Sequence, residues 1–124
     1  MVVEDDDDIR EALAESLVDE GHSCIAFAGG EEALAHVARG GTVPDLILVD
    51  VRMPAMTGDE LVERISGNPT WARVPVVMMT AHSSNYVPPR RTTARAVEIL
   101  HKPIRLDDLL AAVERVLGPP PATA

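Results

Sequence analysis

The chain has 124 residues, of which 46% are hydrophobic and 25% charged, a composition typical of one globular domain with its own core. The net charge of -9 argues against a nucleic-acid surface, which needs clustered Lys and Arg. The single cysteine excludes an internal disulfide and fits a reducing cytosol, so a cytoplasmic location is expected. No apolar segment approaches bilayer length and the acidic N-terminal region lacks a signal-peptide core, so we expect neither membrane insertion nor export.

Strands and helices are predicted to alternate along the chain. Apolar runs of four to six residues, such as Leu46–Val49, predict strands buried on both faces, and apolar residues at helical spacing predict the helices between them. This alternation is typical of a parallel sheet with right-handed crossovers. In chain order, the predicted strands lie near 2–3, 24–27, 46–49, 74–79 and 97–100, and the helices near 9–20, 31–39, 61–65 and 106–117.

Two segments depart from this regular pattern. The pair Pro88-Pro89 is incompatible with a regular helix between the fourth and fifth strands, so we expect an irregular fourth helix there. Residues 119–124 are rich in proline and are predicted to form a tail or linker. The predicted domain therefore spans residues 1–118, and no effector domain is expected within these 124 residues.

Polar residues follow four of the five predicted strands at their C-terminal ends. These ends lie along one edge of a parallel sheet, where open α/β sheets bind ligands. Converging carboxylates repel one another unless a cation neutralises them, and Mg²⁺ is the natural partner for such hard oxygen ligands. This chemistry fits phosphoryl transfer to Asp50, which depends on positioning and charge neutralisation. The converging residues are Glu4, Asp5, Asp50, Thr80, Ala81 and Lys102.

Four segments together resemble the motifs of response regulator receiver domains of two-component (phosphorelay) signal transduction. The resemblance implies a flavodoxin-like, doubly wound sheet of five parallel strands in the order 2-1-3-4-5. It also implies that Asp50 accepts a phosphoryl group from a phosphohistidine of a sensor histidine kinase or a phosphotransfer protein, and that this event switches partner binding. The segments are Val2-Val3-Glu4-Asp5, Leu48-Val49-Asp50-Val51-Arg52-Met53-Pro54, Met79-Thr80-Ala81 and Lys102-Pro103.

The resemblance also implies a role for each site residue. Mg²⁺ would be held directly by Asp5, Asp50 and the backbone carbonyl of Arg52, and Glu4 would act through metal-bound water. The phosphoryl oxygens would be contacted by the Thr80 hydroxyl, the Ala81 amide and the Lys102 ammonium. The Lys102-Pro103 bond is expected to be cis.

Two features differ from the family pattern. Ile99 stands where the family usually has an aromatic residue three positions before the lysine, and Pro88-Pro89 and Arg95-Ala96 occupy the usual fourth helix. Our hypothesis is that partner choice differs here while the phosphorylation chemistry is intact.

Two alternatives remain open beside a signalling domain whose only catalysis is phosphotransfer to itself and slow autodephosphorylation. A Mg²⁺-dependent phosphohydrolase with Asp50 as nucleophile typically needs a second Asp two positions later, where this chain has Arg52. The second alternative is a pseudo-receiver, a domain that has the receiver fold but is never phosphorylated. The cognate kinase, the output, the oligomeric state and membership in a larger protein stay open.

The remaining notable side chains are expected to be structural. Four methionines are predicted to pack in the core, Trp71 is expected to cover the core, and the four histidines are expected at the surface. These residues are Met53, Met56, Met78, Met79, Trp71, His22, His36, His82 and His101.

Overall fold

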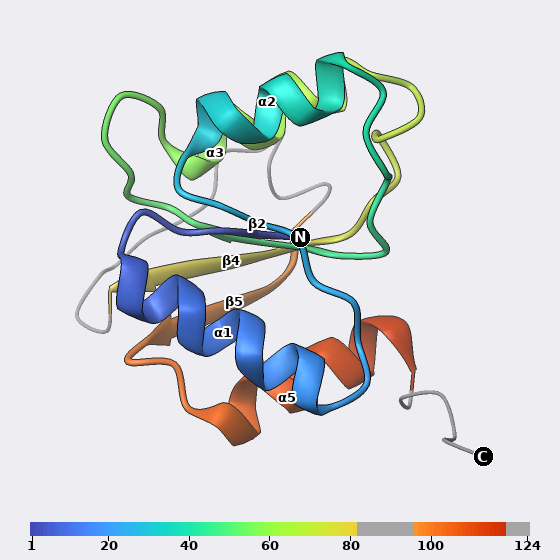
Figure 1. Ribbon diagram of the computed structural model, residues 1–124. Helices are drawn as coiled ribbons and strands as arrows, with labels where there is room; N and C mark the ends of the chain where they lie inside the picture. The colour runs from blue at the N-terminus through green and yellow to red at the C-terminus, as the bar shows by residue number, and fades with distance from the viewer. Residues whose placement is uncertain (82–95, 119–124) are drawn as a thin grey trace.

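The protein folds around a five-stranded parallel sheet with the strand order β2-β1-β3-β4-β5 (Figure 1). The computed structural model describes residues 1–81 and 96–118. The observed strand order confirms the predicted order 2-1-3-4-5. The strands are β1 (Val2–Val3), β2 (Ala26–Phe27), β3 (Ile47–Asp50), β4 (Val76–Ala81) and β5 (Ala96–Lys102).

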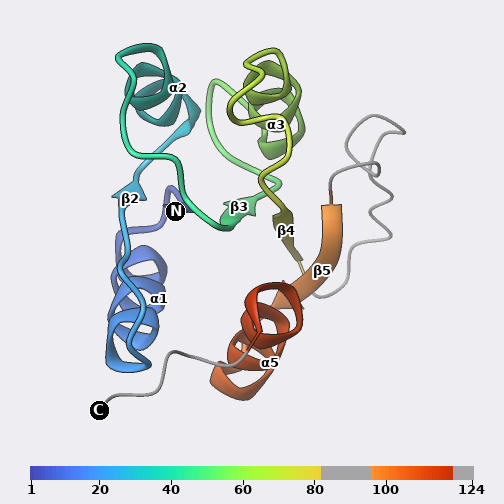
Figure 2. The same cartoon turned by 90° about the vertical axis from the view of Figure 1, so that its right-hand side faces the viewer.

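The helices cover both faces of the sheet. Helices α1 and α5 pack on one face, and α2 and α3 pack on the other (Figures 1 and 2). The predicted irregular fourth helix and the pair Pro88-Pro89 lie outside the described residues. The helices are α1 (Asp7–Asp19), α2 (Gly30–Ala38), α3 (Gly58–Ser66) and α5 (Leu106–Leu117).

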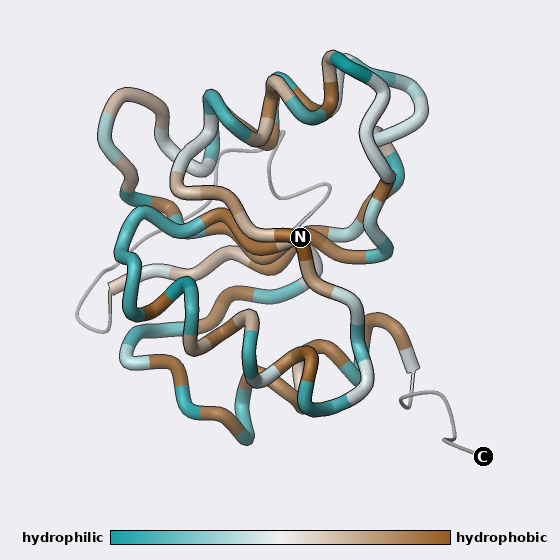
Figure 3. The backbone as a smooth tube through the Cα atoms, viewed as in Figure 1, coloured by the Kyte–Doolittle hydropathy of each residue, from teal (hydrophilic) through white to brown (hydrophobic). Residues whose placement is uncertain are grey.

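Alternating side chains of the central strands build two apolar cores, one on each face of the sheet. In β3, Ile47 and Val49 point toward α2 and α3, whereas Leu48 points toward α1 and α5. Figure 3 shows the hydrophobic colour concentrated along these central strands. Because both faces are covered, β3 is apolar at each of its first three positions, as the unbroken run in the sequence predicts.

Helix α1 begins directly after the acidic loop that follows β1. The Asp6 carboxylate caps this helix by accepting a hydrogen bond from the Ile9 amide at 3.0 Å. Asp7 and Asp8 lie in the first turn, where negative charge is favoured by the helix dipole. Local capping therefore fixes the point at which the chain turns away from the sheet edge.

His36 is buried, so the prediction that it lies at the surface is wrong. Its Nε2 atom lies 2.9 Å from the Thr42 carbonyl oxygen, and its ring packs against Phe27 and Trp71. A Cβ atom on Gly41 would lie 2.2 Å from this ring, so the glycine leaves the space that the imidazole fills.

Most of the other predictions for the structural side chains are confirmed. The four methionines and Trp71 are buried, which confirms their predicted packing roles. His101 is exposed, as predicted, and His22 is half-buried. His82 lies outside the described residues. No helix within residues 1–81 and 96–118 combines the length and apolar character that crossing a bilayer would require.

Candidate functional site

The register of the sheet brings the predicted polar residues to one edge. Asp50 ends β3 and pairs with Met79 of β4, so Thr80 lies one residue beyond this pair on the neighbouring strand. Ala81 of β4 pairs in turn with Lys102 at the end of β5. Neighbouring strands lie about 4.8 Å apart, so these side chains share a narrow region of the edge.

Three carboxylates form the acidic part of the site. Each of Glu4, Asp5 and Asp50 offers an oxygen that lies within 4.8 Å of the others. Glu4 is 0% exposed and Asp50 is 4% exposed, whereas Asp5 is open to solvent. The site is therefore buried on the side of Glu4 and Asp50 and accessible to a ligand from solvent on the side of Asp5.

Lys102 bridges the two buried acids. Its Nζ atom donates to Glu4 Oε1 at 2.7 Å and lies 3.2 Å from Asp50 Oδ2. The Lys102 side chain is 24% exposed, so its ammonium group is partly shielded from water. The Lys102-Pro103 bond that follows is cis, as the sequence resemblance implies.

Burial and the neighbouring charges shift the pKa values of both Glu4 and Lys102. Burial, and then the neighbouring Asp50 carboxylate, raise the pKa of Glu4 to about 7, although the Lys102 ammonium opposes this rise. Burial alone would lower the pKa of Lys102, but the carboxylates of Glu4 and Asp50 outweigh it and raise that pKa. Burial is thus the main cause of the raised pKa of Glu4, and the neighbouring Asp50 carboxylate adds to it.

The loop between β3 and α3 packs directly on the Asp50 backbone. The Arg52 amide lies 3.4 Å from Asp50 Oδ1, and the Gly58 amide donates to the Val51 carbonyl at 2.9 Å. A Cβ atom on Gly58 would lie 2.4 Å from the Asp50 carbonyl oxygen, so this position requires glycine. Asp50 is thus held by its own strand and by the start of α3.

Ala55 turns this loop sharply. Its φ is +67°, and the Met56 amide donates to the Pro54 carbonyl at 2.7 Å, which is the hydrogen bond of a γ-turn. A side chain at positive φ costs free energy relative to glycine, so the surrounding packing maintains this conformation. The turn places Met56 against Gly30, the first residue of α2.

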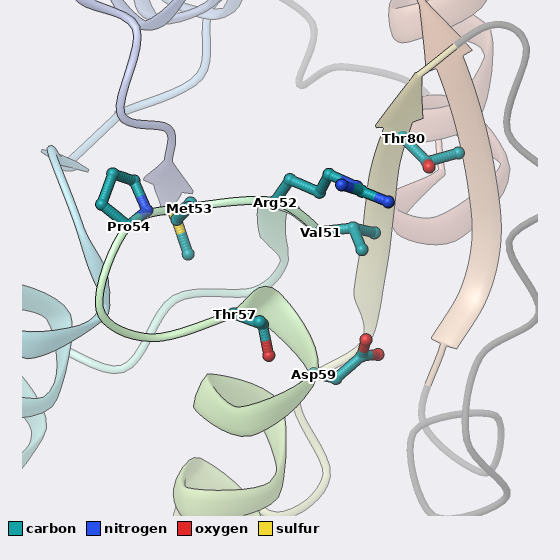
Figure 4. Close-up of a pocket in the computed structure, with 7 residues that line it drawn as sticks. All are labelled: Val51, Arg52, Met53, Pro54, Thr57, Asp59 and Thr80. Atoms are coloured by element: carbon teal, nitrogen blue, oxygen red, sulfur yellow. The ribbon is translucent and has the colours of Figure 1, made fainter.

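A cleft of about 590 Å³ opens directly after Asp50 in the chain, between this loop and the end of β4 (Figure 4). In Figure 4 the Arg52 side chain extends from the loop toward β4, and Thr57 and Asp59 lie at the start of α3. The cleft provides space for a group that approaches the end of β3 from outside. Its lining residues are Val51, Arg52, Met53, Pro54, Thr57, Asp59 and Thr80.

The structure thus gathers all the predicted site residues at one edge. Sequence reasoning missed Arg10, which donates from Nη1 to the Glu4 carbonyl at 3.0 Å, and it missed Thr57 and Asp59 of the cleft. The spacing of Asp7 and Arg10, three residues apart on a predicted helix, was an available signal for an ion pair.

The donor set fits a small divalent cation. Carboxylate and carbonyl oxygens are the ligands that Mg²⁺ prefers, and the three carboxylates of this cluster outnumber the Lys102 ammonium that contacts two of them. Among the residues that the structure describes, this cluster contains neither cysteine nor histidine, which argues against a site built for zinc.

Comparison with known proteins gives a consistent result. The family model described as "Response regulator receiver domain" matches residues 1–114. The chain is 37% identical over 117 residues to the DNA-binding transcriptional regulator NtrC of Salmonella typhimurium, covering 94% of this chain and 24% of that protein. It is 35% identical over 117 residues to the transcriptional regulatory protein PdtaR of Mycobacterium tuberculosis, covering 92% and 54%. The chain thus spans about a quarter of the length of NtrC.

Solved structures show the same architecture. The chemotaxis protein CheY4 of Vibrio cholerae superimposes with a TM-score of 0.82 at 32% identity, covering 94% of this chain and 95% of that one. The receiver domain of NtrX from Brucella abortus gives a TM-score of 0.80 at 29% identity, with 94% and 95% covered.

Proposed function

The chain belongs to the response regulator receiver domain family of phosphorelay signalling, and we propose that Asp50 is its phosphoacceptor. The observation that carries this proposal is the position of the Asp50 carboxylate. It is nearly buried at the end of β3, lies 3.2 Å from the Lys102 ammonium and directly precedes Val51 and Arg52, which line the open cleft. The donor is a phosphohistidine on a sensor histidine kinase or a phosphotransfer protein.

The transfer step uses groups of known position. A carboxylate oxygen of Asp50 forms a bond to phosphorus while the phosphorus–nitrogen bond to the partner's imidazole breaks. The bonding pair stays on the imidazole nitrogen, which takes up one proton. An ammonium has three N–H donors, so Lys102 can contact a phosphoryl oxygen while it keeps its contacts with the Glu4 and Asp50 carboxylates. The Thr80 hydroxyl and the Ala81 amide, on the adjacent strand, supply further donors to the phosphoryl oxygens.

Asp5, Asp50 and the Arg52 carbonyl would hold Mg²⁺ directly, and Glu4 would act through a metal-bound water. When bound, the cation supplies positive charge that offsets the carboxylates and the phosphoryl oxygens. Glu4 and Asp5 then serve the site by keeping oxygen atoms within 4.8 Å of the Asp50 carboxylate. The family is a signalling family, and we infer that this domain is a switch with no separate substrate to turn over.

The residue two positions after Asp50 does not support the phosphohydrolase alternative. Arg52 occupies this position, and a guanidinium stays protonated and cannot act as general acid and base in turn.

We treat residues 1–118 as the receiver unit and 119–124 as a tail or linker. Phosphorylation would then change how this unit contacts a downstream protein or domain, in a cytoplasmic setting.

The test is the intact mass of the protein after incubation with acetyl phosphate, with and without Mg²⁺. We expect a Mg²⁺-dependent gain of one phosphoryl group in the wild type and no gain in Asp50→Asn. Asp45→Asn is the matched control, because Asp45 is an exposed acid before the opposite end of the same strand, and this variant should gain the group normally.

No gain in the wild type, with Mg²⁺ binding still detectable, would contradict the proposal and favour a pseudo-receiver. A gain that persists in Asp50→Asn would place the acceptor elsewhere.

A further inference from the structure

Arg10 lies on α1, yet its side chain returns to the loop that carries two of the acids. Nη1 donates to the backbone carbonyl of Glu4 at 3.0 Å, and Nη2 lies 2.5 Å from Asp7 Oδ1. The Arg10 side chain is 22% exposed, whereas that of Asp7 is 82% exposed. The Arg10 side chain is therefore largely covered, and it contacts the exposed Asp7 carboxylate.

Glu4 is held from two directions as a result. Lys102 of β5 holds its carboxylate, and Arg10 of α1 holds its main-chain carbonyl. The Glu4 Oε2 atom also accepts the Asp5 amide at 3.1 Å, so the orientation of Glu4 sets the start of the Asp5 backbone. A group that fixes the Glu4 carbonyl thus fixes the loop on which both acids stand.

The loop needs such a fixed point because its own charges work against it. Asp5 and Asp6 are exposed in the loop directly after the buried Glu4, and the exposed Asp7 and Asp8 follow at once in the first turn of α1. Like charges at this density repel and favour a more open loop. The planar fork of arginine reaches a carbonyl and a carboxylate together, which the single ammonium of lysine does less well.

We propose that Arg10 is a positioning residue that holds the Glu4–Asp5 loop in the geometry required for cation binding. This inference rests on the proposed function of the site, because it assumes that Glu4 and Asp5 serve a bound Mg²⁺. Arg10 does not touch the cation or the phosphoryl group in this scheme. It acts through the Glu4 carbonyl alone.

Positioning and simple charge make opposite predictions. Arg10→Lys keeps the positive charge but loses the fork, so a positioning role predicts weaker Mg²⁺ binding, with a dissociation constant raised about tenfold, as for other residues that orient metal ligands. If Arg10 contributed only charge, Arg10→Lys would bind like the wild type. Arg10→Met would then bind more tightly, because a repelling cation has been removed.

The measurement is a titration of the full chain with Mg²⁺ alone, followed by the amide NMR signals of Asp5 and Asp50. The same spectra report whether each variant is folded. Arg115→Lys is the matched control, because Arg115 also pairs with a carboxylate, that of Glu98, but lies on α5 and is well exposed. This control should bind Mg²⁺ as the wild type does.

A second pair of variants tests the contact without altering Arg10. Asp7→Asn and Asp8→Asn each remove one exposed negative charge from the first turn of α1, but only Asp7 contacts Arg10. Positioning predicts that Asp7→Asn weakens Mg²⁺ binding more than Asp8→Asn. This pair decides the matter if Arg10→Lys does not fold.

The outcomes separate the two levels of inference. Weaker binding by Arg10→Lys, with phosphoryl uptake restored at saturating Mg²⁺, supports the positioning role. Binding within twofold of the wild type in folded Arg10→Lys, or equal effects of Asp7→Asn and Asp8→Asn, would overturn it and leave the proposed function intact. Absence of Mg²⁺ binding by the wild type would overturn the proposed metal site and this inference together.

Discussion

The two sides of Asp50 are built in different ways. The acid side, formed by Glu4, Asp5 and Lys102, is held by charged side chains from the loop after β1 and from β5, with Arg10 of α1 behind it. The cleft side, formed by the residues that line the 590 Å³ cleft, is held by backbone packing at Gly58 and by the turn at Ala55. The comparison teaches that charge balance and free space are controlled separately around one carboxylate.

The largest expected effect comes from removing the cation of the acid side. Lys102→Met should lower the free energy of unfolding by about 3 kcal/mol at pH 8, because it leaves the buried Glu4 and Asp50 uncompensated. The loss should be smaller at pH 6, where Glu4 takes up a proton. Urea unfolding at both pH values measures it, and Arg115→Met, which breaks an exposed pair, should lower the free energy of unfolding far less than Lys102→Met does. A loss of equal size at both pH values would contradict this account.

The second effect is the pH dependence of the metal-free protein. The pKa of Glu4 is about 7 in the folded protein, above the ordinary value of 4.5, so the folded state keeps a proton that the unfolded chain releases. Protonated Glu4 therefore contributes about 2–3 kcal/mol to the free energy of unfolding below pH 4.5, and this contribution is lost as the pH rises through 7. Chelated wild type and Glu4→Gln should therefore differ in the slope of stability against pH. Glu60→Gln, at an exposed acid, should keep the wild-type slope.

The third effect tests the cleft side. Gly58→Ala should lower the free energy of unfolding by about 2 kcal/mol, because the new methyl group meets the Asp50 carbonyl oxygen, which is backbone and cannot move freely. Phosphoryl uptake should fall as well, since Asp50 must shift. Gly67→Ala is the control: Gly67 has φ -70°, and its nearest contact is 3.3 Å. Equal stability of these two alanine variants would disprove the close-approach role of Gly58.

The smallest effect has the opposite sign. Ala55→Gly should raise the free energy of unfolding by about 0.5 kcal/mol, because glycine adopts φ +67° without steric cost. The same substitution at Ala35, an exposed position inside α2, should lower it by about 0.5–1 kcal/mol. Thermal unfolding of both variants under one buffer condition provides the comparison. Destabilisation by Ala55→Gly would show that the γ-turn carries little strain.

Much of the acid side follows from sequence, whereas most of the cleft side does not. The alternation of strands and helices and the polar residues at strand ends were sufficient to predict a parallel sheet with Glu4, Asp50 and Lys102 at one edge, whereas the strand order came from the family resemblance. These features depend on periodicity and on the shared edge of a parallel sheet. The contact between Gly58 and the Asp50 carbonyl depends on how the loop folds back, which no periodicity encodes.

The same reason explains the misplaced histidine and the differing strand ends. His36 was expected outside because isolated histidines are usually polar surface residues, but Gly41, Phe27 and Trp71 create its space through tertiary packing. The second strand is confined to Ala26–Phe27, where β1 offers two pairing residues, although the apolar run in the sequence begins at Cys24. Strand length is set by the neighbour as well as by composition.

The burial of Trp71 against His36 gives the molecule a built-in optical reporter. The chain has one tryptophan, and it lies before β4, at the end of the sheet opposite to the acids. Its fluorescence should report the packing of the α2 and α3 layer. The emission should not change when a ligand binds at the sheet edge that carries the acids. Unfolding and site occupancy can thus be recorded in one sample by two independent signals, fluorescence for the former and amide resonances for the latter.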